Sequence, residues 1–525
     1  MRAVVNHPFV LAVVSGLLLF CGSPGGGNFW PLVFVALVPY FLGVLQVRQR
    51  VRPFLVGLVF GVIHHTLHLY WLVAVLGKYG GLPLPVAVAG LALLVLYMAL
   101  YSAIFASGAA FFYHRYPIGV TLVVVPALWV GIDWFRGIFL TGFPWMDIGY
   151  MLYSVVPIIQ VADLFGHHGV SYLVVLVNCL GFLLLGGKYR AREVFLLTAL
   201  VAAITGAVLV YGQNRLAGIA HRMAADQTRR IKVGIVQGNI DQSRKWSSRL
   251  KEETVDKYLR ATVLLKKREN VSCVIWPETA MPFYPQSSPF TDVLQTFARR
   301  LELTVMTGAP WYETIDSSRS NQEYFNSAML ILPDGRLGGR YFKSHLVPFG
   351  EYVPLKRLLP FLAPLVEAVG DFSSGKIEKP LTLVDGAKAG VLICFESVFP
   401  ELSRKWVLAG SNVLVNLTND AWYGKSSAPY HSLAMSVFRA VETRRSLIRS
   451  ANTGISAFIT PAGRINKQSE IFVDWSAAAD VVLMPTMTFW TGYGFWFGPA
   501  CLVLAVLGIV VGCTRRVWTE DRFMH

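Results

Sequence analysis

Eight long apolar runs constrain the fold of this 525-residue chain more than any other feature. A helix needs about 20 apolar residues to cross the hydrocarbon core of a bilayer. We expect such spans at residues 8–21, 29–46, 53–76, 84–113, 118–137, 168–186, 194–212 and 491–513. The chain is 54% hydrophobic, with a mean hydropathy of +0.50, which is too apolar for an ordinary soluble enzyme. The sequence therefore predicts an α-helical polytopic membrane domain with eight transmembrane helices.

The stretch between the seventh and eighth runs has a different composition. Residues 215–488 mix apolar segments with many charges and are long enough to bury a core of their own. We therefore divide the chain into a seven-helix domain at residues 1–214, a water-facing domain at 215–488, and an eighth helix with its tail at 489–525.

Basic residues beside the spans indicate which loops face the cytoplasm, where Lys and Arg gather. They flank alternate ends of the spans: Arg2, Arg48, Arg50, Arg52, Arg115, Lys188, Arg190, Arg192, Arg515 and Arg516. The intervening short loops CGSPGGGN and GKYGGLP contain only one, Lys78. Both termini are therefore predicted to be cytoplasmic, and residues 215–488 extracytoplasmic.

The net charge of +16 would also fit a nucleic-acid-binding protein. However, no zinc-finger spacing or glycine-rich RNA motif accompanies it, and much of the basic excess lies at membrane edges. We interpret the charge as cytoplasmic anchoring against anionic lipid, and we predict no nucleic-acid partner.

Histidine and cysteine side chains allow more than one interpretation. His64 and His68 lie four residues apart beside His65, a spacing that suits either a metal pair or polar packing between helices. No Cys, Asp or Glu stands close to them in the sequence, which favours packing. The six cysteines do not form a disulfide framework, and Cys273 is expected in the core of a strand.

Short apolar segments alternate with helical ones in the water-facing domain. Strands are expected at RRIKVGIVQGNI, SCVIWPET, TVMTGAP, FNSAMLILP, GGRYFKSHLVP, KAGVLICFES, SNVLVNLTND and ISAFITPAGRI, and helices at 244–268 and 428–448. This alternation predicts a buried sheet covered by helices, with its chemistry at the strand ends.

Three chemically complementary side chains follow apolar runs of this domain: Glu278 in VIWPE, Lys343 in GRYFKSH and Cys394 in VLICFES. A thiolate nucleophile, a carboxylate that shuttles protons and a cation that stabilises an oxyanion can together perform acyl transfer. A helix expected near 398–409 and a nearby ammonium would lower the pKa of the Cys394 thiol. Taken singly, the three residues have plain alternatives, namely a helix-start carboxylate, a surface lysine and a core cysteine.

Four motifs of the water-facing domain resemble those of the nitrilase, or carbon–nitrogen hydrolase, superfamily. They are WPE at 276–278, KSHLVPFGEYVP at 343–354, CFE at 394–396 and NLTNDAWYG at 416–424. The eight spans, with LTGFPW at 140–145 and KW at 245–246, narrow the resemblance to the apolipoprotein N-acyltransferase family. The resemblance implies an α/β αββα sandwich with a Glu-Lys-Cys triad. Phe395 departs from the pattern, because a tyrosine often follows the nucleophile in that family.

The resemblance also implies roles for individual residues. Cys394 would be the nucleophile, Glu278 the general base and acid, and Lys343 the oxyanion stabiliser, with Glu351 and Glu396 as supporting acids. An acyl chain would pass from a phospholipid, typically phosphatidylethanolamine, to the α-amine of diacylglyceryl-cysteine in an apolipoprotein. The expected location is the inner membrane of a Gram-negative bacterium, with the catalytic domain in the periplasm. No metal or cofactor is implied.

Three further residues are candidates for contact with lipid or substrate. Arg136 and Trp145 lie in FRGIFLTGFPWMD, where they suit either headgroup contact or simple interfacial anchoring. By resemblance, Trp246 and the apolar stretch 358–369 would form a flap at the membrane surface.

Two other functions compete with this one. A membrane-tethered amidase would hydrolyse a small amide without lipid, and its spans would serve only as an anchor. A transporter or scaffold with a non-catalytic domain would not need Cys394. The presence of Glu278, Lys343 and Cys394 together argues against the second of these alternatives.

Overall fold

The computed structural model describes residues 7–45, 52–186, 189–241, 248–314, 322–352, 372–494 and 496–514. The chain divides into two compact units. A helical unit comprises residues 1–72, 88–216 and 493–525, and a sheet unit comprises residues 73–87 and 217–492.

The longer helices of the helical unit follow the apolar runs. They are α2 (Pro8–Gly22), α3 (Val38–Leu45), α4 (Pro53–Leu69), α6 (Leu84–Arg115), α7 (Ile118–Arg136), α10 (His167–Gly186), α11 (Ala191–Ala224) and α17 (Phe497–Thr514). Shorter pieces are η1 (Trp30–Phe34), η3 (Phe139–Thr141), η4 (Ile148–Leu152), α8 (Val156–Ile159) and α9 (Ala162–Phe165).

Five helices within the described residues are long and apolar enough to cross a membrane: α6, α7, α10, α11 and α17. A sixth would be α4 continued across a 58° bend into Leu72–Tyr79. The α2 helix has 15 residues, so it rises only about 22 Å, less than the roughly 30 Å of a hydrocarbon core. The predicted span 29–46 is divided between η1 and α3. The chain is thus a membrane protein with about five long apolar helices, and the predicted count of eight is not confirmed.

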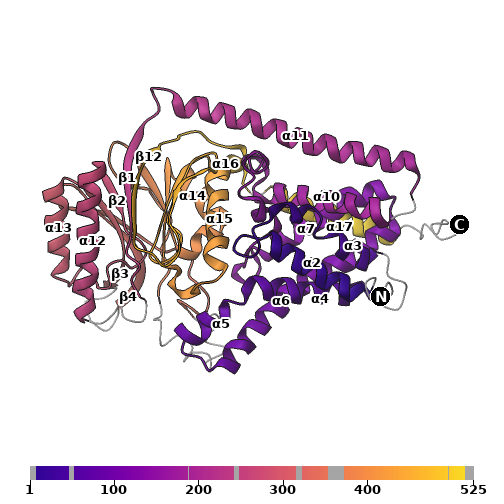
Figure 1. Cartoon of the computed structure of the whole chain (residues 1–525), viewed down its shortest axis with the longest axis horizontal. Coiled ribbons are helices and arrows are strands. Elements are labelled where there is room, and N and C mark those ends of the chain that lie inside the picture. Colours follow the sequence, from indigo (N-terminus) through magenta and orange to yellow (C-terminus); the bar gives the residue numbers. More distant parts are fainter. Residues whose placement is uncertain are drawn as a thin grey trace. The chain divides into compact units, whose positions relative to one another are not determined.

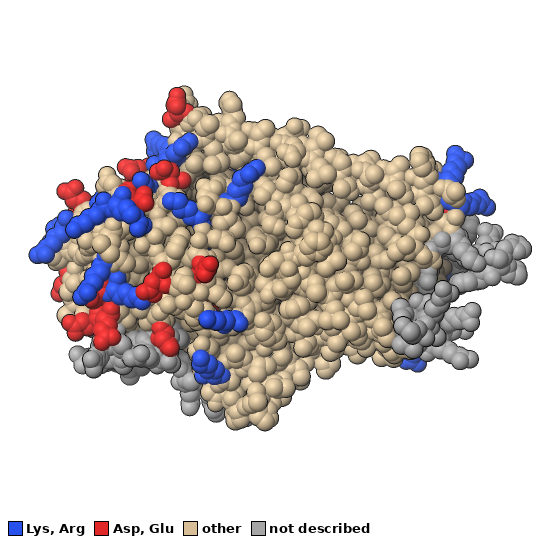
Figure 2. All heavy atoms as spheres, in the orientation of Figure 1, with Lys and Arg blue, Asp and Glu red and all other residues tan. Residues whose placement is uncertain are grey.

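Exposed apolar side chains cover the helical unit. Leu93, Leu185 and Phe195 are each more than 70% exposed, as expected of residues that face lipid. In the view of Figure 2, the region of these helices shows few Lys, Arg, Asp or Glu side chains.

Two six-stranded sheets build the sheet unit. The first has the order β12-β1-β2-β3-β4-β5 and the second the order β11-β10-β9-β8-β7-β6. The strands of the first are β1 (Arg230–Gln237), β2 (Cys273–Ile275), β3 (Thr304–Thr314), β4 (Gln322–Ile331), β5 (Leu337–Phe342) and β12 (Trp475–Val482). Those of the second are β6 (Leu381–Thr382), β7 (Lys388–Ile393), β8 (Val413–Thr418), β9 (Ser446–Ala451), β10 (Ala457–Ile459) and β11 (Ile465–Gln468). In each sheet the three consecutive strands β1, β2 and β3, or β7, β8 and β9, run parallel.

Helices cover both outer faces of the paired sheets (Figure 1). They are α12 (Ser248–Glu269) and α13 (Phe290–Leu301) on the first sheet, and α14 (Pro400–Leu408) and α15 (Ala428–Thr443) on the second. The two sheets contact each other through β1 and β9 and through β4 and β7. The predicted sheet covered by helices is therefore confirmed, in the form of two packed sheets between two layers of helices.

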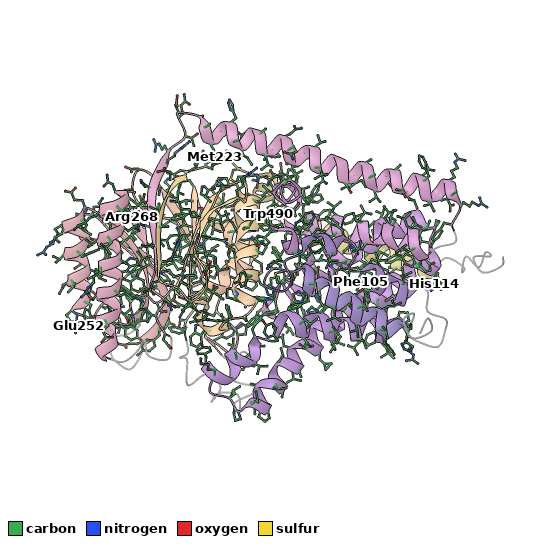
Figure 3. The ribbon with its side chains drawn as sticks, viewed as in Figure 1. Phe105, His114, Met223, Glu252, Arg268 and Trp490 are labelled. Carbon is green, nitrogen blue, oxygen red and sulfur yellow. The ribbon has the colours of Figure 1, made fainter. Side chains whose placement is uncertain are left out.

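The amphipathic sequence of α12 explains how it covers its sheet. Val255, Tyr258 and Leu265 are buried against the first sheet. The opposite face carries exposed charges, among them Glu252 and Arg268, which lie near the two ends of the helix (Figure 3). Burial of this apolar face is the main driving force for docking the helix.

Short turns connect these elements and carry much of the polar chemistry. They are η6 (Cys394–Val398) and η7 (Asp420–Tyr423), with α16 (Phe489–Tyr493) close to the end of the unit. Two pieces from the bend after α4, α5 (Leu72–Ala74) and η2 (Val75–Tyr79), belong almost wholly to the sheet unit.

Candidate active site

Polar residues that end strands of both sheets meet at one place in the sheet unit. Glu278 follows β2, Lys343 follows β5, and Cys394 and Asn419 follow the neighbouring parallel strands β7 and β8. Carboxyl ends of parallel strands are where such sheets place polar groups. A hydrogen bond joins Glu278 to Asn419, and electrostatic interactions join Lys343 to Cys394 and Glu278.

Glu278 is held by donors from both sheets. The Nδ2 of Asn326, on β4, donates to Glu278 Oε1 at 2.7 Å, and the backbone N–H of Asn419 donates to Oε2 at 2.8 Å. The side of Glu278 toward β3 is closed by Gly308, where a Cβ would lie 2.6 Å from Glu278 Cα. The carboxylate is thus fixed in place, and Glu278 is only 7% exposed.

Lys343 is completely buried and paired with Glu351. Its Nζ lies 2.9 Å from Glu351 Oε1 and 2.8 Å from Oε2. Burial alone would lower the pKa of Lys343, but the charges of Glu351, Cys394 and Glu278 outweigh it and hold that pKa above its usual value. Lys343 therefore remains a cation. Glu351 also accepts from Asn326 Nδ2 at 3.0 Å, so Asn326 bridges Glu278 and Glu351.

Cys394 occupies a strained position at the start of η6. Its backbone φ is +52°, in the left-handed region that non-glycine residues seldom adopt. Burial, and next the charge of Glu278, raise the pKa of its thiol to about 12, although Lys343 acts in the opposite direction. The expectation of a lowered thiol pKa is therefore wrong. The reason is that η6 separates Cys394 from the helix that begins at Pro400, and that burial outweighs the nearby ammonium.

Glu396 connects the turn after β7 with the loop that carries Lys343. Its Oε2 accepts from the backbone N–H of Ile393 at 2.7 Å. Its Oε1 accepts from the N–H groups of Ser344 and His345 at 2.7 and 3.0 Å and from the Tyr341 hydroxyl at 2.8 Å. Burial raises the pKa of this carboxyl above its usual range. Glu396 therefore holds the segments on either side of the site in register.

Sequence reasoning missed three residues that support this site. Asn326 lies within β4, and a lone Asn in a strand carries no recognisable signal. Asp420, within the NLTNDAWYG motif, accepts from Arg449 Nη2 at 2.8 Å, and both side chains are fully buried. Arg449 also donates to Asn416, which anchors β8 and β9 to each other.

The other sequence-predicted residues lie in different surroundings. The Phe395 ring packs edge-on against Phe399, with 5.1 Å between centroids. Trp246 and residues 358–369 lie outside the described residues. Arg136 and Trp145 are both buried in the helical unit, where Arg136 pairs with Asp133 and Asp147.

The three histidines of α4 are not among the described side chains that lie close enough together to share an ion. His64, His65 and His68 are buried, and His68 Nδ1 lies 2.8 Å from the carbonyl oxygen of His64. Among the described residues, the three side chains close enough to share an ion are instead Asp147, His167 and His168. Arg136 already pairs with the Asp147 carboxylate, which disfavours a second cation there.

Two family models match separate parts of the chain. The apolipoprotein N-acyltransferase N-terminal domain matches residues 15–180, and carbon-nitrogen hydrolase matches residues 232–474. A crystal structure of a carbon-nitrogen hydrolase from Helicobacter pylori covers 48% of this chain and 89% of its own, with 17% identity and a TM-score of 0.36.

Curated relatives match along nearly the whole length. The apolipoprotein N-acyltransferase of Geobacter metallireducens is 38% identical over 523 residues, covering 98% of this chain and 97% of the relative. That of Methylococcus capsulatus is 32% identical over 525 residues, covering 97% and 96%. The chain therefore belongs to the apolipoprotein N-acyltransferase family.

Proposed function

We propose that this protein moves a fatty acyl chain from a phospholipid, through a thioester on Cys394, to the N-terminal α-amine of diacylglyceryl-cysteine in apolipoproteins. Phosphatidylethanolamine is the proposed donor. Besides membership of the family, one observation supports this proposal most directly. The charges of Glu278 and Lys343 both act on the partly exposed Cys394 thiol, where Glu278 raises the thiol pKa and Lys343 lowers it.

In the first half-reaction, Glu278 accepts the thiol proton as the Cys394 sulfur attacks the ester carbonyl of the phospholipid. A carbon–sulfur bond forms, and the carbonyl oxygen becomes an oxyanion that the Lys343 ammonium stabilises. The ester carbon–oxygen bond then breaks, and the lysophospholipid oxygen takes the proton back from Glu278. The raised thiol pKa, about 12, makes a base at this position necessary.

In the second half-reaction, the neutral α-amine of the acceptor attacks the thioester carbonyl. A carbon–nitrogen bond forms, the carbon–sulfur bond breaks, and Glu278 transfers the amine proton to the departing sulfur. Water must be kept out while the thioester waits, because hydrolysis would waste it. Membrane spans in the same chain would allow both substrates to arrive from the bilayer.

Several residues are proposed to support this chemistry without reacting. Glu351 orients Lys343 through their ion pair, and Glu396 keeps the lysine loop in register with the cysteine turn. Phe395 supplies its backbone N–H to the oxyanion. Trp246, Arg136 and Trp145 are proposed to contact lipid or substrate.

We also propose the topology inferred from charge: eight spans, both termini in the cytoplasm, and residues 215–488 in the periplasm of a Gram-negative inner membrane. The segments 1–214 and 489–525 would be the membrane parts. Reporter fusions at residues 313–322 test this. They should be active as a periplasmic phosphatase and dark as a cytoplasmic fluorescent protein, and the reverse result would refute the orientation.

Intact-mass spectrometry tests the acyl-enzyme. After incubation with phosphatidylethanolamine vesicles, the wild-type protein should gain one acyl mass, and Cys394→Ala should gain none. Cys513→Ser is the matched control, because Cys513 is also an unpaired cysteine but lies exposed on α17. An acyl adduct that survives Cys394→Ala, or turnover of that variant, would exclude the proposed nucleophile.

A further inference from the structure

One buried amide group of β4 bonds to two carboxylates of the site. The Asn326 Nδ2 donates to Glu278 Oε1 at 2.7 Å and to Glu351 Oε1 at 3.0 Å. The same oxygen of Glu351 lies 2.9 Å from the Lys343 Nζ. The amide nitrogen and the ammonium therefore share one acceptor, and Glu278 bonds to the amide.

The hairpin of β4 and β5 places this amide beside the lysine. The two strands pair antiparallel with Ser327 opposite Phe342, so Asn326 and Lys343 are the next opposite pair. The Lys343 N–H donates to the Asn326 carbonyl oxygen at 2.9 Å, which continues the pairing to these residues. Side chains directly opposite each other in an antiparallel pair lie on the same face, with Cβ atoms about 4.5–5.5 Å apart. The amide and the lysine side chain therefore leave neighbouring points of the backbone.

The two carboxylates determine which way the Asn326 amide faces. Its Nδ2 carries two N–H groups, whereas its Oδ1 can only accept. The reverse orientation would place Oδ1 against two acceptors. Oδ1 is itself buried without a hydrogen-bond partner among the described residues, which is a cost to folding. The amide is therefore oriented by the carboxylates and not by the needs of its own oxygen.

The Lys343 ammonium has three N–H groups to donate. Glu351 accepts through both of its oxygens, at 2.9 and 2.8 Å, so it accounts for two of them. Within the described part of the chain, the third remains available for an oxyanion. The charge of Glu278 also acts on Lys343, but less strongly than the charges of Glu351 and Cys394.

Direct pairing between Glu278 and Lys343 would weaken both groups. A carboxylate held by an ammonium accepts a proton less readily than one held by neutral N–H groups. The pairing would also occupy the N–H group that an oxyanion needs. Neutral donors hold Glu278 instead, because Oε1 accepts from Asn326 and Oε2 accepts from the N–H of Asn419.

We propose that Asn326 is a positioning residue that keeps the Glu278 carboxylate from pairing with the Lys343 ammonium. The assignment rests on the proposed function, in which Glu278 is the base for Cys394 and Lys343 stabilises the oxyanion. Asn326 transfers no proton itself. It allows a base and a cation to act separately within one buried site.

Asn326→Leu is the first test, because leucine branches at the same carbon but donates no hydrogen bond. Single-turnover acylation in vesicles of phosphatidylethanolamine is followed by intact mass. Loss of a hydrogen bond to a charged group should slow acylation by about 10- to 150-fold. Asn466→Leu is the matched control at an exposed position of β11, and it should keep the wild-type rate. A wild-type rate in Asn326→Leu would show that Asn326 serves only to fill space.

A second background separates this role from simple anchoring of Glu278. Lys343→Met removes the ammonium, so Glu278 has no cation with which to pair. Adding Asn326→Leu to Lys343→Met should then slow acylation by no more than about 3-fold, because the two changes affect one interaction. Asn326→Ala should show the same difference between the two backgrounds. Equal slowing with and without Lys343 would refute the proposed separation.

The structure of Asn326→Leu provides a readout that does not depend on rates. Its Glu278 carboxylate should lie within about 4 Å of the Lys343 Nζ, the distance of an ion pair. A Glu278 carboxylate that keeps its wild-type position would overturn the assignment, even in a variant that acylates slowly.

Cys394→Ala distinguishes failure of this proposal from failure of the proposed function. If Cys394→Ala still transfers acyl chains, the nucleophile is wrong and the role of Asn326 falls with it. If Cys394→Ala is inactive while Asn326→Leu acylates at the wild-type rate, only the role of Asn326 is refuted.

Discussion

The Cys394 thiol holds its proton more tightly than an ordinary thiol does. Burial and Glu278 raise its pKa to about 12, so very little thiolate exists at neutral pH. Storing the nucleophile as a protonated thiol protects it from alkylation and oxidation between turnovers. Ionisation must then coincide with attack, which requires a base already in place. Glu278, fixed by Asn326 and the Asn419 N–H, meets that requirement.

Glu278→Gln should change alkylation and acyl transfer in opposite directions. Removing its negative charge removes one of the causes that raise the Cys394 pKa, so the thiolate fraction at a given pH increases. Iodoacetamide should therefore modify Cys394 faster. Single-turnover acyl transfer should fall by about 10²- to 10⁴-fold, because the proton acceptor is lost.

Glu401→Gln, on the surface of α14, is the control and should change neither rate. If alkylation and acyl transfer of Glu278→Gln both slowed together, Glu278 would be a structural residue and not the base.

His345 should make the protein sensitive to acid. Burial and the charge of Lys343 lower its pKa from 6.5 to about 4. At a pH between these two values, His345 is protonated in the unfolded chain but not in the folded chain. The free energy of unfolding therefore falls as the pH drops from 6.5 to 4. His345→Gln should flatten this decline in melting temperature. At pH 7 the variant should be slightly less stable, because His345 packs on Phe399 at 3.9 Å between centroids.

His221→Gln, at an exposed position of α11, provides the comparison and should keep the wild-type acid profile. An identical decline in wild type and His345→Gln would show that other groups govern acid unfolding.

At the scale of elements, two turns and one loop must be aligned to form the site. The turns η6 and η7 extend parallel strands of the second sheet, whereas the Lys343 loop leaves the first sheet. Glu396 bridges the Lys343 loop to the end of β7, and Glu278 joins the end of β2 to η7. Carboxylates that accept backbone N–H groups therefore fasten one sheet to the other.

Glu396→Gln should disturb this alignment more than it disturbs the fold. An amide retains one acceptor oxygen but loses the charge-assisted bonds to Ile393, Ser344 and His345. A displacement of about 1 Å can cost 10²-fold in rate, so we expect acylation to fall by about that factor. The melting temperature should drop by several degrees. The phospholipid concentration at half-maximal rate should change little, because Glu396 does not contact substrate. A variant with full activity and a lower melting temperature would show that alignment does not depend on Glu396.

The bend after α4 shows what a hydropathy pattern leaves open for a whole element. Residues 53–76 read as one apolar span, but α4 ends at Leu69, and residues 73–87 belong to the sheet unit. Hydropathy records only that a segment is apolar, and an apolar segment can pack on protein as well as on lipid. Here Tyr79 packs on Trp422, a contact between segments more than 300 residues apart that no local pattern predicts.

Across the whole molecule, what the sequence predicts depends on how local the signal is. The layered sheet unit follows from alternating apolar segments, and Glu278, Lys343 and Cys394 stand out because each follows such a segment. Asn326 and Arg449 act only through partners distant in the sequence, so nothing in the sequence around them indicates their role. The direction in which the Cys394 pKa shifts could not be predicted, because it depends on how deeply the thiol is buried. The number of spans stays a prediction, since helix length and bends also decide whether an apolar run crosses the membrane.

The helical unit contains a buried ionic cluster whose role can be separated from its effect on folding. Arg136 Nη2 lies 3.1 Å from Asp133 Oδ1 and pairs with Asp147, which also lies 2.9 Å from His167 Nε2. All four residues are buried. Removing only the cation leaves carboxylates uncompensated, so Arg136→Met should lower the free energy of unfolding by about 3–5 kcal/mol.

Combining Arg136→Met with Asp147→Asn should recover much of that loss, because the second change removes a buried charge that has lost its partner. Unfolding in detergent measures both variants. Acyl transfer by the double variant then decides whether Arg136 also contacts lipid. If it does, the folded double variant should need several times more phospholipid to reach half its maximal rate, with little change in that maximal rate. If the double variant has wild-type stability and wild-type phospholipid dependence, Arg136 does not contact lipid and serves only to hold the loop of Asp147 against α7.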